Sequence, residues 1–211
     1  MVEALPPVGQ LRRGRHTLSR EEVRASQHAR MLTAMSEVVG EKGYVATSVS
    51  DVVRRAGVSR ETFYEQFTDK QACFLAALEA ATELVLREVM AAAEGPGTPI
   101  ERFERALDAY LERLSAHPSR SRTFLVEVYA AGPRAGVVLA QLQRRFSDAA
   151  ATLFGATDDR DRFACDALVS AVISMATSRI SAGDPDVTDL APRILDLVGR
   201  ALTAEVRSSP R

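Results

Sequence analysis

The stretch Thr47–Lys70, with the sequence TSVSDVVRRAGVSRETFYEQFTDK, predicts two short helices joined by a tight turn. Thr47 is expected to cap the first helix, and Gly57 to end it, because glycine adopts the left-handed conformation without a steric cost. Ser59 is expected to cap the second helix, whose Phe63 faces inwards. A short helix with an anchored apolar side and a polar start is a shape that the major groove of DNA admits.

The predicted second helix has one apolar side and one polar side. Phe63 and Phe67 are four residues apart and share one face, which would anchor the helix to the body of its domain. The side chains left facing outwards or sideways are Arg60, Glu61, Thr62, Tyr64 and Gln66. Because arginine can bind guanine through two hydrogen bonds, Arg60 and Thr62 are the best candidates for reading bases.

Several of these residues occur together at the spacing of a known family. The stretch resembles the DNA-binding domain of TetR-family transcriptional repressors in Thr47, the AGVS sequence at Ala56–Ser59, Thr62, Phe63, Tyr64, Phe67 and Lys70. The resemblance extends from about Arg20 to Leu78 and implies a helix-turn-helix regulator of a double-stranded DNA operator. It implies phosphate contacts from Thr47, Tyr64 and Lys70. The predicted DNA-binding residues are Thr47, Ser59, Arg60, Glu61, Thr62, Tyr64 and Lys70.

One position departs from the family pattern. Where the family often has glycine as the second residue of the recognition helix, this chain has Glu61. Glycine would let the backbone approach DNA closely. The carboxylate could instead accept a hydrogen bond from cytosine N4, or it could repel the phosphates.

Charge is distributed unevenly along a chain whose net charge is only −1. Residues 10–70 contain 11 Lys and Arg against 8 Asp and Glu, a net of +3, whereas residues 71–211 contain 16 against 19, a net of −3. The basic excess therefore coincides with the predicted DNA-binding region. The basic cluster Leu11–His16 could follow a phosphate strand or enter a minor groove, or be a solvated tail.

The whole chain predicts an all-α fold of about nine helices, because helical periodicity recurs and strand-like alternation does not. Capping boxes are expected at Ser19–Glu22, Thr68–Gln71 and Thr98–Glu101. We expect a flexible basic arm over residues 1–18, a three-helix DNA-binding domain over residues 19–68, and a helical ligand-binding and dimerisation domain over residues 69–211. One of the nine helices is expected in the apolar segment Ser121–Ala131, before Gly132 and Pro133.

The last two expected helices, over residues 160–182 and from Leu190 onwards, are more apolar than one small bundle requires. Pairing with the same helices of a second copy would bury them in a four-helix interface, as the resemblance implies. A central helix buried within a monomer is the alternative. The apolar run Ala167–Ala176 is too short to span a bilayer and the first residues lack a secretory signal, so we expect a cytoplasmic protein.

The second domain is expected to hold a cavity for a hydrophobic small-molecule effector. The predicted lining residues are Phe103, Leu107, Tyr110, Phe124, Glu127, Val128 and Tyr129. Glu127 would be either a polar anchor in this cavity or the polar edge of a packed helix.

No cofactor, catalytic group or metal site is expected. The sequence has no glycine-rich phosphate loop, and His16, His28 and His117 have no metal-ligand spacing. Cys73 and Cys165 are expected to be small buried residues. Two alternatives to an effector-responsive repressor are a DNA-binding protein without an effector and, remotely, a helical enzyme that uses Glu127 and Tyr129.

Overall fold

The computed structural model describes the backbone of residues 19–208 and the side chains of residues 19–200. The predicted basic arm, residues 1–18, lies outside this range. Over the described residues the chain forms nine α-helices and one 3₁₀ helix and no strand, which confirms the predicted all-α class. The helices are α1 (Arg20–Lys42), α2 (Val49–Ala56), α3 (Arg60–Tyr64), α4 (Lys70–Ala92), α5 (Pro99–Ala116), α6 (Pro118–Leu125), η1 (Glu127–Ala131), α7 (Pro133–Phe154), α8 (Asp159–Ser181) and α9 (Leu190–Ser208).

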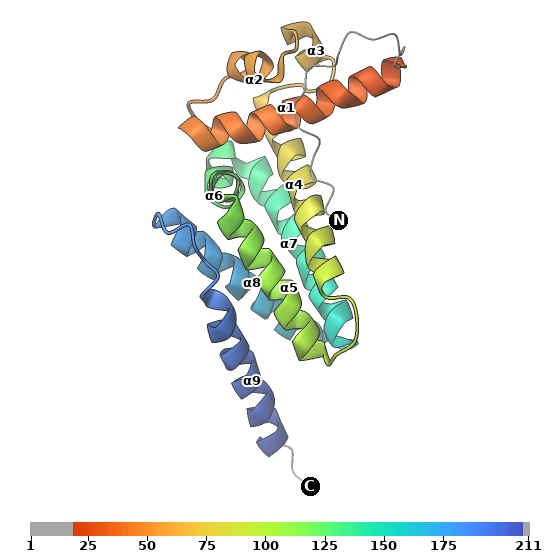
Figure 1. The fold of residues 1–211 in the computed structure, drawn as a ribbon, viewed down its shortest axis with the longest axis vertical. Coiled ribbons are helices and arrows are strands. Elements are labelled where there is room, and N and C mark those ends of the chain that lie inside the picture. Colours follow the sequence, from red (N-terminus) through yellow and green to blue (C-terminus); the bar gives the residue numbers. More distant parts are fainter. Residues whose placement is uncertain (1–18, 209–211) are drawn as a thin grey trace.

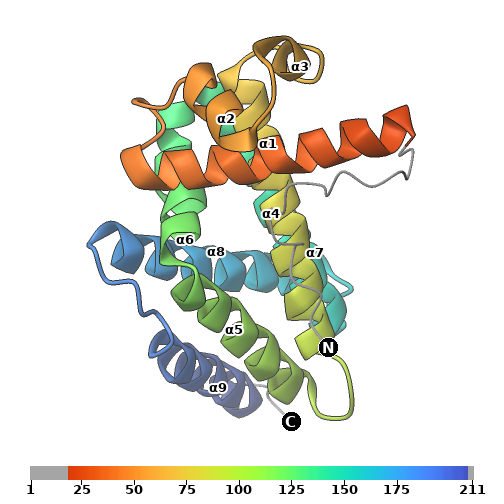
Figure 2. The ribbon, with the colours of Figure 1, turned by 45° about the horizontal axis from the view of Figure 1, so that its top comes forward.

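The first three helices form one end of the molecule (Figure 1). Helix α1 lies across the ends of α4, α6 and α7, while α2 and α3 lie on its outer side. Figure 2 shows the same arrangement from another direction, with α3 at the extremity of the molecule and α9 alongside α5 at the other end. The predicted recognition helix is therefore presented at one end of the fold.

Local capping signals position most helix starts as expected. Ser19 and Glu22 form the predicted capping box of α1, and Thr98 and Glu101 form that of α5. Helix α2 begins one residue later than predicted: Ser48, not Thr47, is its cap and exchanges hydrogen bonds with Asp51. The reason is that the Thr47 hydroxyl is already committed, since it donates to the Gly43 carbonyl at 2.8 Å.

Two further expectations about helices are wrong. Asp69 rather than Thr68 caps α4, with its carboxylate accepting from the Ala72 N–H at 2.7 Å. The segment Ser121–Ala131 is not a single helix, because the chain leaves α-helical geometry at Val126 (φ −113°) and continues as η1. This break turns the side chain of Glu127 towards the loop that joins α1 to α2.

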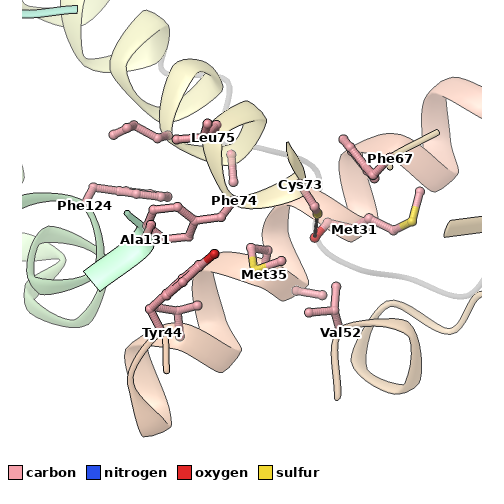
Figure 3. Packing of buried hydrophobic residues seen from close by; sticks show 14 of the residues in the cluster. Met31, Met35, Tyr44, Val52, Phe67, Cys73, Phe74, Leu75, Phe124 and Ala131 are labelled. Atoms are coloured by element: carbon pink, nitrogen blue, oxygen red, sulfur yellow. Dashed lines mark hydrogen bonds between the residues drawn. The ribbon is translucent and has the colours of Figure 1, made fainter. Parts of the chain in front are cut away.

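The helices are held together by three groups of buried apolar side chains, of which the smallest joins α7 to α8. The group that we call the first cluster joins α1, α2, α3 and the start of α4 to residues of α6, η1 and α7. Figure 3 shows Phe124 of α6 beside Phe74 of α4, which in turn lies against Tyr44; the ring centroids are 6.0 and 4.9 Å apart. The predicted domain boundary between residues 68 and 69 thus crosses a continuous core, and it stays a prediction.

The second group, which we call the cavity cluster, lies at the other end and joins α5, α8 and α9 to the end of α7. Helix α8 belongs to it through only one of its faces, because Phe163 is 74% exposed and Met175 is 39% exposed. By length and composition alone, α8 could cross a membrane, and most of its apolar window is not buried in the monomer. Core helices of water-soluble proteins pass the same test, so this is weak evidence for a membrane span.

Candidate nucleic-acid interface and ligand cavity

The recognition helix α3 packs against the core through one side and is exposed on the other. Ser59 caps it as predicted, accepting from the Thr62 N–H at 3.0 Å, and Gly57 ends α2 in the left-handed conformation at φ 63°. Phe63 and Phe67 are buried, with ring centroids 5.5 Å apart. The polar side chains of α3 are therefore held on a rigid support, as groove recognition requires.

Arg60 does not extend freely from this helix. Its Nη1 donates to Ser50 Oγ and its Nη2 to Tyr64 Oη, each at 3.3 Å, and its guanidinium carbon lies 5.6 Å from the Tyr64 ring centroid. The three side chains form a group of hydrogen-bond donors on the outer surface of α2 and α3. Ser50 was not among the predicted DNA-binding residues, although its place in the first turn of α2 could have indicated it.

Lys70 and Thr47, both predicted to bind phosphate, are used inside the fold. The Lys70 ammonium donates to the carbonyl oxygens of Tyr44 at 2.8 Å and Thr47 at 2.9 Å, and it lies 4.1 Å from the Tyr44 ring centroid. Partial burial lowers the pKa of this ammonium. Thr47 is buried and its hydroxyl donates to Gly43. The geometry therefore favours structural roles for both side chains over the predicted phosphate contacts.

A histidine supports the far end of the recognition segment. His28 of α1 is hydrogen-bonded through Nδ1 to Gln66 Oε1 at 3.0 Å and stacks on Phe67 at 5.0 Å. From its sequence, His28 was considered only as a metal ligand. No sequence signal joins it to Gln66, because their contact depends on how α1 crosses beneath α3.

Both arginines of α2 form ion pairs with neighbouring carboxylates. Arg55 pairs with Glu37 at 3.1 Å and Glu41 at 2.7 Å. Asp51 lies between Lys42 and Arg54, and hydrogen bonds from Lys42 and then Ser48 hold the pKa of its carboxyl well below the ordinary value. These cations are less available to DNA than the net charge of the region suggests.

An apolar cavity of about 70 Å³ lies between α4, α5, α7 and α8. Its lining residues are Val89, Met90, Phe103, Ala106, Leu107, Tyr110, Phe146, Ala149, Ala150, Leu153, Val169, Val172 and Ile173. Three predicted residues, Phe103, Leu107 and Tyr110, are among them. The lining presents no polar surface to the cavity. Burial raises the pKa of the Tyr110 hydroxyl.

The other four predicted lining residues lie elsewhere, so that part of the prediction is wrong. Phe124 and Val128 pack in the first cluster, and Tyr129 is 69% exposed. The carboxylate of Glu127 accepts from the Tyr44 N–H at 3.0 Å and lies 3.9 Å from Arg122. The break at Val126 explains the positions of the three residues on η1, because it directs η1 towards the start of the loop after α1. Phe124 precedes the break and packs on Phe74 of α4.

Cys73 and Cys165 are free and buried, as predicted. Burial raises the pKa of the Cys73 thiol to about 12. Within residues 19–200, no group of three or more His, Cys, Asp or Glu side chains could hold a metal ion.

The chain matches known regulators of transcription. Residues 32–77 match the family described as bacterial regulatory proteins, tetR family. The HTH-type transcriptional activator FasR of Mycolicibacterium smegmatis is 30% identical over 57% of this chain and 52% of its own length. The HTH-type transcriptional regulator EthR of the same organism is 26% identical over 72% of this chain and 69% of its own length. The chain thus spans about half the length of the first of these relatives.

Solved structures show the same fold. A TetR-like transcriptional regulator from Rhodococcus sp. RHA1 is 26% identical and superposes with a TM-score of 0.62 over 88% of this chain and 98% of its own. FadR from Bacillus subtilis, solved in complex with stearoyl-CoA, is 15% identical, with a TM-score of 0.71 over 81% and 96% of the two chains. The family and these relatives are transcriptional regulators and not enzymes. Residues 32–77 thus carry the match to the TetR family of bacterial regulatory proteins.

Proposed function

We propose that the protein is a dimeric DNA-binding repressor that a hydrophobic small molecule releases from a palindromic operator. The observation that carries DNA binding is the geometry of α3, whose polar side chains stand at one end of the molecule on buried Phe63 and Phe67. The match of residues 32–77 to the tetR family supports the same function. As a regulator of transcription, the protein would work in the cytoplasm.

The proposed dimer forms through α8 and α9. Exposed apolar side chains on both helices support it: Phe163 and Met175 on α8, and Leu197, 57% exposed, on α9. Pairing two copies through these helices would bury the apolar surface and place two recognition helices on one duplex. A defined dimer mass in sedimentation, without binding to lipid vesicles, would separate this use of α8 from a membrane span.

The proposed effector site is the apolar cavity. Its walls come from four different helices and its lining is apolar, which suits an apolar group. FadR, which shares this fold, was solved with stearoyl-CoA, so fatty acyl compounds are sensible first probes. A thermal-shift screen of apolar metabolites, with and without DNA, tests the site; an absence of stabilising compounds would favour regulation without an effector.

We propose that the signal passes along α4. Val89 and Met90 near its end line the cavity, whereas Lys70 at its start holds the carbonyls of Tyr44 and Thr47 before α2. A small tilt of α4 would change the separation of the two recognition helices, which must match half-sites about 34–36 Å apart. A coupling of about 1–3 kcal/mol would change DNA affinity about 5- to 150-fold.

Selection from a random duplex library, followed by affinity measurements at several salt concentrations, tests DNA binding. We expect an inverted repeat and, for roughly 4 to 5 neutralised phosphates per subunit, a log–log salt slope of about −7 to −9 per dimer. A library without any enriched sequence would contradict the function. Because the relative FasR is named an activator, transcription in vitro from the selected site must decide between repression, which we propose, and activation.

A further inference from the structure

Only one of the three side chains that could read bases from the start of α3 is unengaged. Arg60 is held by Ser50 and Tyr64 at 3.3 Å each, and the Thr62 hydroxyl lies 2.9 Å from the hydroxyl of the capping Ser59. The Glu61 side chain is exposed, and its carboxylate makes no hydrogen bond or ion pair with any other part of the chain that the structure describes, although its backbone carbonyl accepts from the Glu65 N–H. Its carboxylate is therefore free to meet a base edge.

The chemistry of a carboxylate limits which base edge it can recognise. An ionised carboxylate only accepts hydrogen bonds, so it cannot bind the acceptors of guanine (N7, O6) or thymine (O4). Donors are available on cytosine N4 and adenine N6, but adenine also presents the acceptor N7 next to its amine, which would repel a carboxylate. Cytosine is the base that fits.

Next to the phosphates, an unpaired carboxylate would oppose binding to every DNA sequence. A cytosine amine would offset this repulsion at one base pair only, so a glutamate here weakens binding to all sequences except those with the correct base. The same residue thus provides both attraction to the correct site and rejection of wrong ones.

We propose that Glu61 specifies a cytosine in each operator half-site by accepting a hydrogen bond from its N4 amine. Arg60, braced across Ser50 and Tyr64, then contacts the sugar-phosphate backbone instead of a guanine. This inference rests on the proposed DNA-binding function and adds to it the base that the unusual residue of α3 reads.

Binding-site selection with the wild type, Glu61→Ala and Glu61→Gln tests the assignment, with Glu65→Gln as a matched control on the same exposed segment. The wild type and the control should enrich a C·G pair at one position of each half-site. Glu61→Ala should lose that preference, about 5- to 150-fold, and keep the rest of the motif. Glu61→Gln should change the preferred pair to A·T, because a glutamine amide matches adenine N6 and N7.

A chemical substitution in the DNA gives an independent readout. Replacing the selected cytosine by a pyrimidine analogue without the exocyclic amine should weaken wild-type binding and leave Glu61→Ala binding unchanged relative to its own cytosine control. Thermal melting of each variant confirms that it is folded.

Two results would overturn the inference while leaving DNA binding intact: an unchanged selection profile for Glu61→Ala, or a gain in affinity that is equal on all sequences, which would reduce Glu61 to a source of repulsion. Failure of the wild type to enrich any sequence would instead contradict the DNA-binding function and the inference together.

Discussion

The first cluster and the cavity cluster differ in the interactions that join their helices. Polar contacts between distant parts of the chain cross the first cluster: Lys70 binds the carbonyl of Tyr44, Glu127 binds its N–H, and Gln71 Nε2 donates to the Ala131 carbonyl at 2.5 Å. The cavity cluster has polar contacts at its edge, where Ser115 Oγ accepts from the Val187 N–H and Arg113 pairs with Glu88, each at 3.1 Å, but its interior is apolar packing around an incompletely filled space. Hydrogen bonds fix position and direction, whereas apolar side chains can repack. The difference suits a rigid DNA-reading end and an adaptable ligand-binding end.

The largest effect should come from removing the ammonium that ties α4 to the loop before α2. We expect Lys70→Ala to lower the free energy of unfolding by about 2–3 kcal/mol, because two largely buried carbonyls lose a charged donor. DNA affinity should fall with a nearly unchanged salt slope. Urea unfolding and salt-dependent binding measure the two quantities.

The control for this change is Lys42→Ala. The Lys42 ammonium pairs with Asp51 at the surface, so its removal should change the free energy of unfolding little. If Lys70→Ala instead left stability unchanged and flattened the salt slope by about one unit per subunit, Lys70 would be a phosphate contact as the family pattern implies.

The next effect compares the same enlargement of a side chain in the first cluster and in the wall of the cavity. Ala77→Leu, in the first cluster, should lower the free energy of unfolding by about 1–3 kcal/mol because the site is fully packed. Ala150 lines the cavity, so the larger side chain of Ala150→Leu can fill empty space. This change should lower the free energy of unfolding by less than about 1 kcal/mol, or raise it. Equal losses in thermal or urea unfolding would show that the two sites are packed alike.

A smaller effect should follow from cutting the contact between η1 and the α1–α2 loop. Glu127→Ala leaves the Tyr44 N–H without its acceptor and should cost about 1 kcal/mol of stability. Glu127→Gln keeps an acceptor oxygen and should restore most of this loss. Glu112→Ala, an exposed change on α5, is the control. If Glu127→Gln were as unstable as Glu127→Ala, the charge and its contact with Arg122 would matter more than the hydrogen bond.

The smallest effect concerns alkaline pH. Burial raises the pKa of Cys73 from 9.0 to about 12, so the folded state holds this proton when the unfolded state has lost it. Stability is then fully present below pH 9 and falls as the pH rises towards 12. Cys73→Ala should reduce the slope measured by urea unfolding between pH 8 and 10.5, and a slope identical to that of the wild type would contradict the assignment. Burial also raises the pKa values of Tyr44 and Tyr110, so part of the fall should remain.

Local signals in the sequence predicted the recognition helix better than the positions of its neighbours. Gly57, Ser59 and the pair Phe63 and Phe67 act over one or two helical turns, and their predicted places are confirmed. Thr47 and Ser48 are equally able to cap a helix, and the choice between them depends on the burial of Thr47 against α1. No local pattern carries that information.

The cavity shows the same limit. Phe103, Leu107 and Tyr110 follow one regular helix, so periodicity placed them on its inner face. Phe124 lies on the separate helix α6 and Val128 lies on η1 after the break at Val126, so neither continues the inner face of α5. Their position depends on contacts with Tyr44 and Phe74, which lie far away in the sequence.

The most direct test of whether the cavity controls the DNA-reading end is a titration. It measures operator affinity against effector concentration for the wild type and for Ala150→Leu. An effector found by thermal shift should weaken wild-type binding about 5- to 150-fold. Ala150→Leu should bind the operator as tightly as the wild type and should no longer respond, because the leucine occupies the space of the ligand. An equal loss of DNA affinity in both proteins would show that the effector acts from another site.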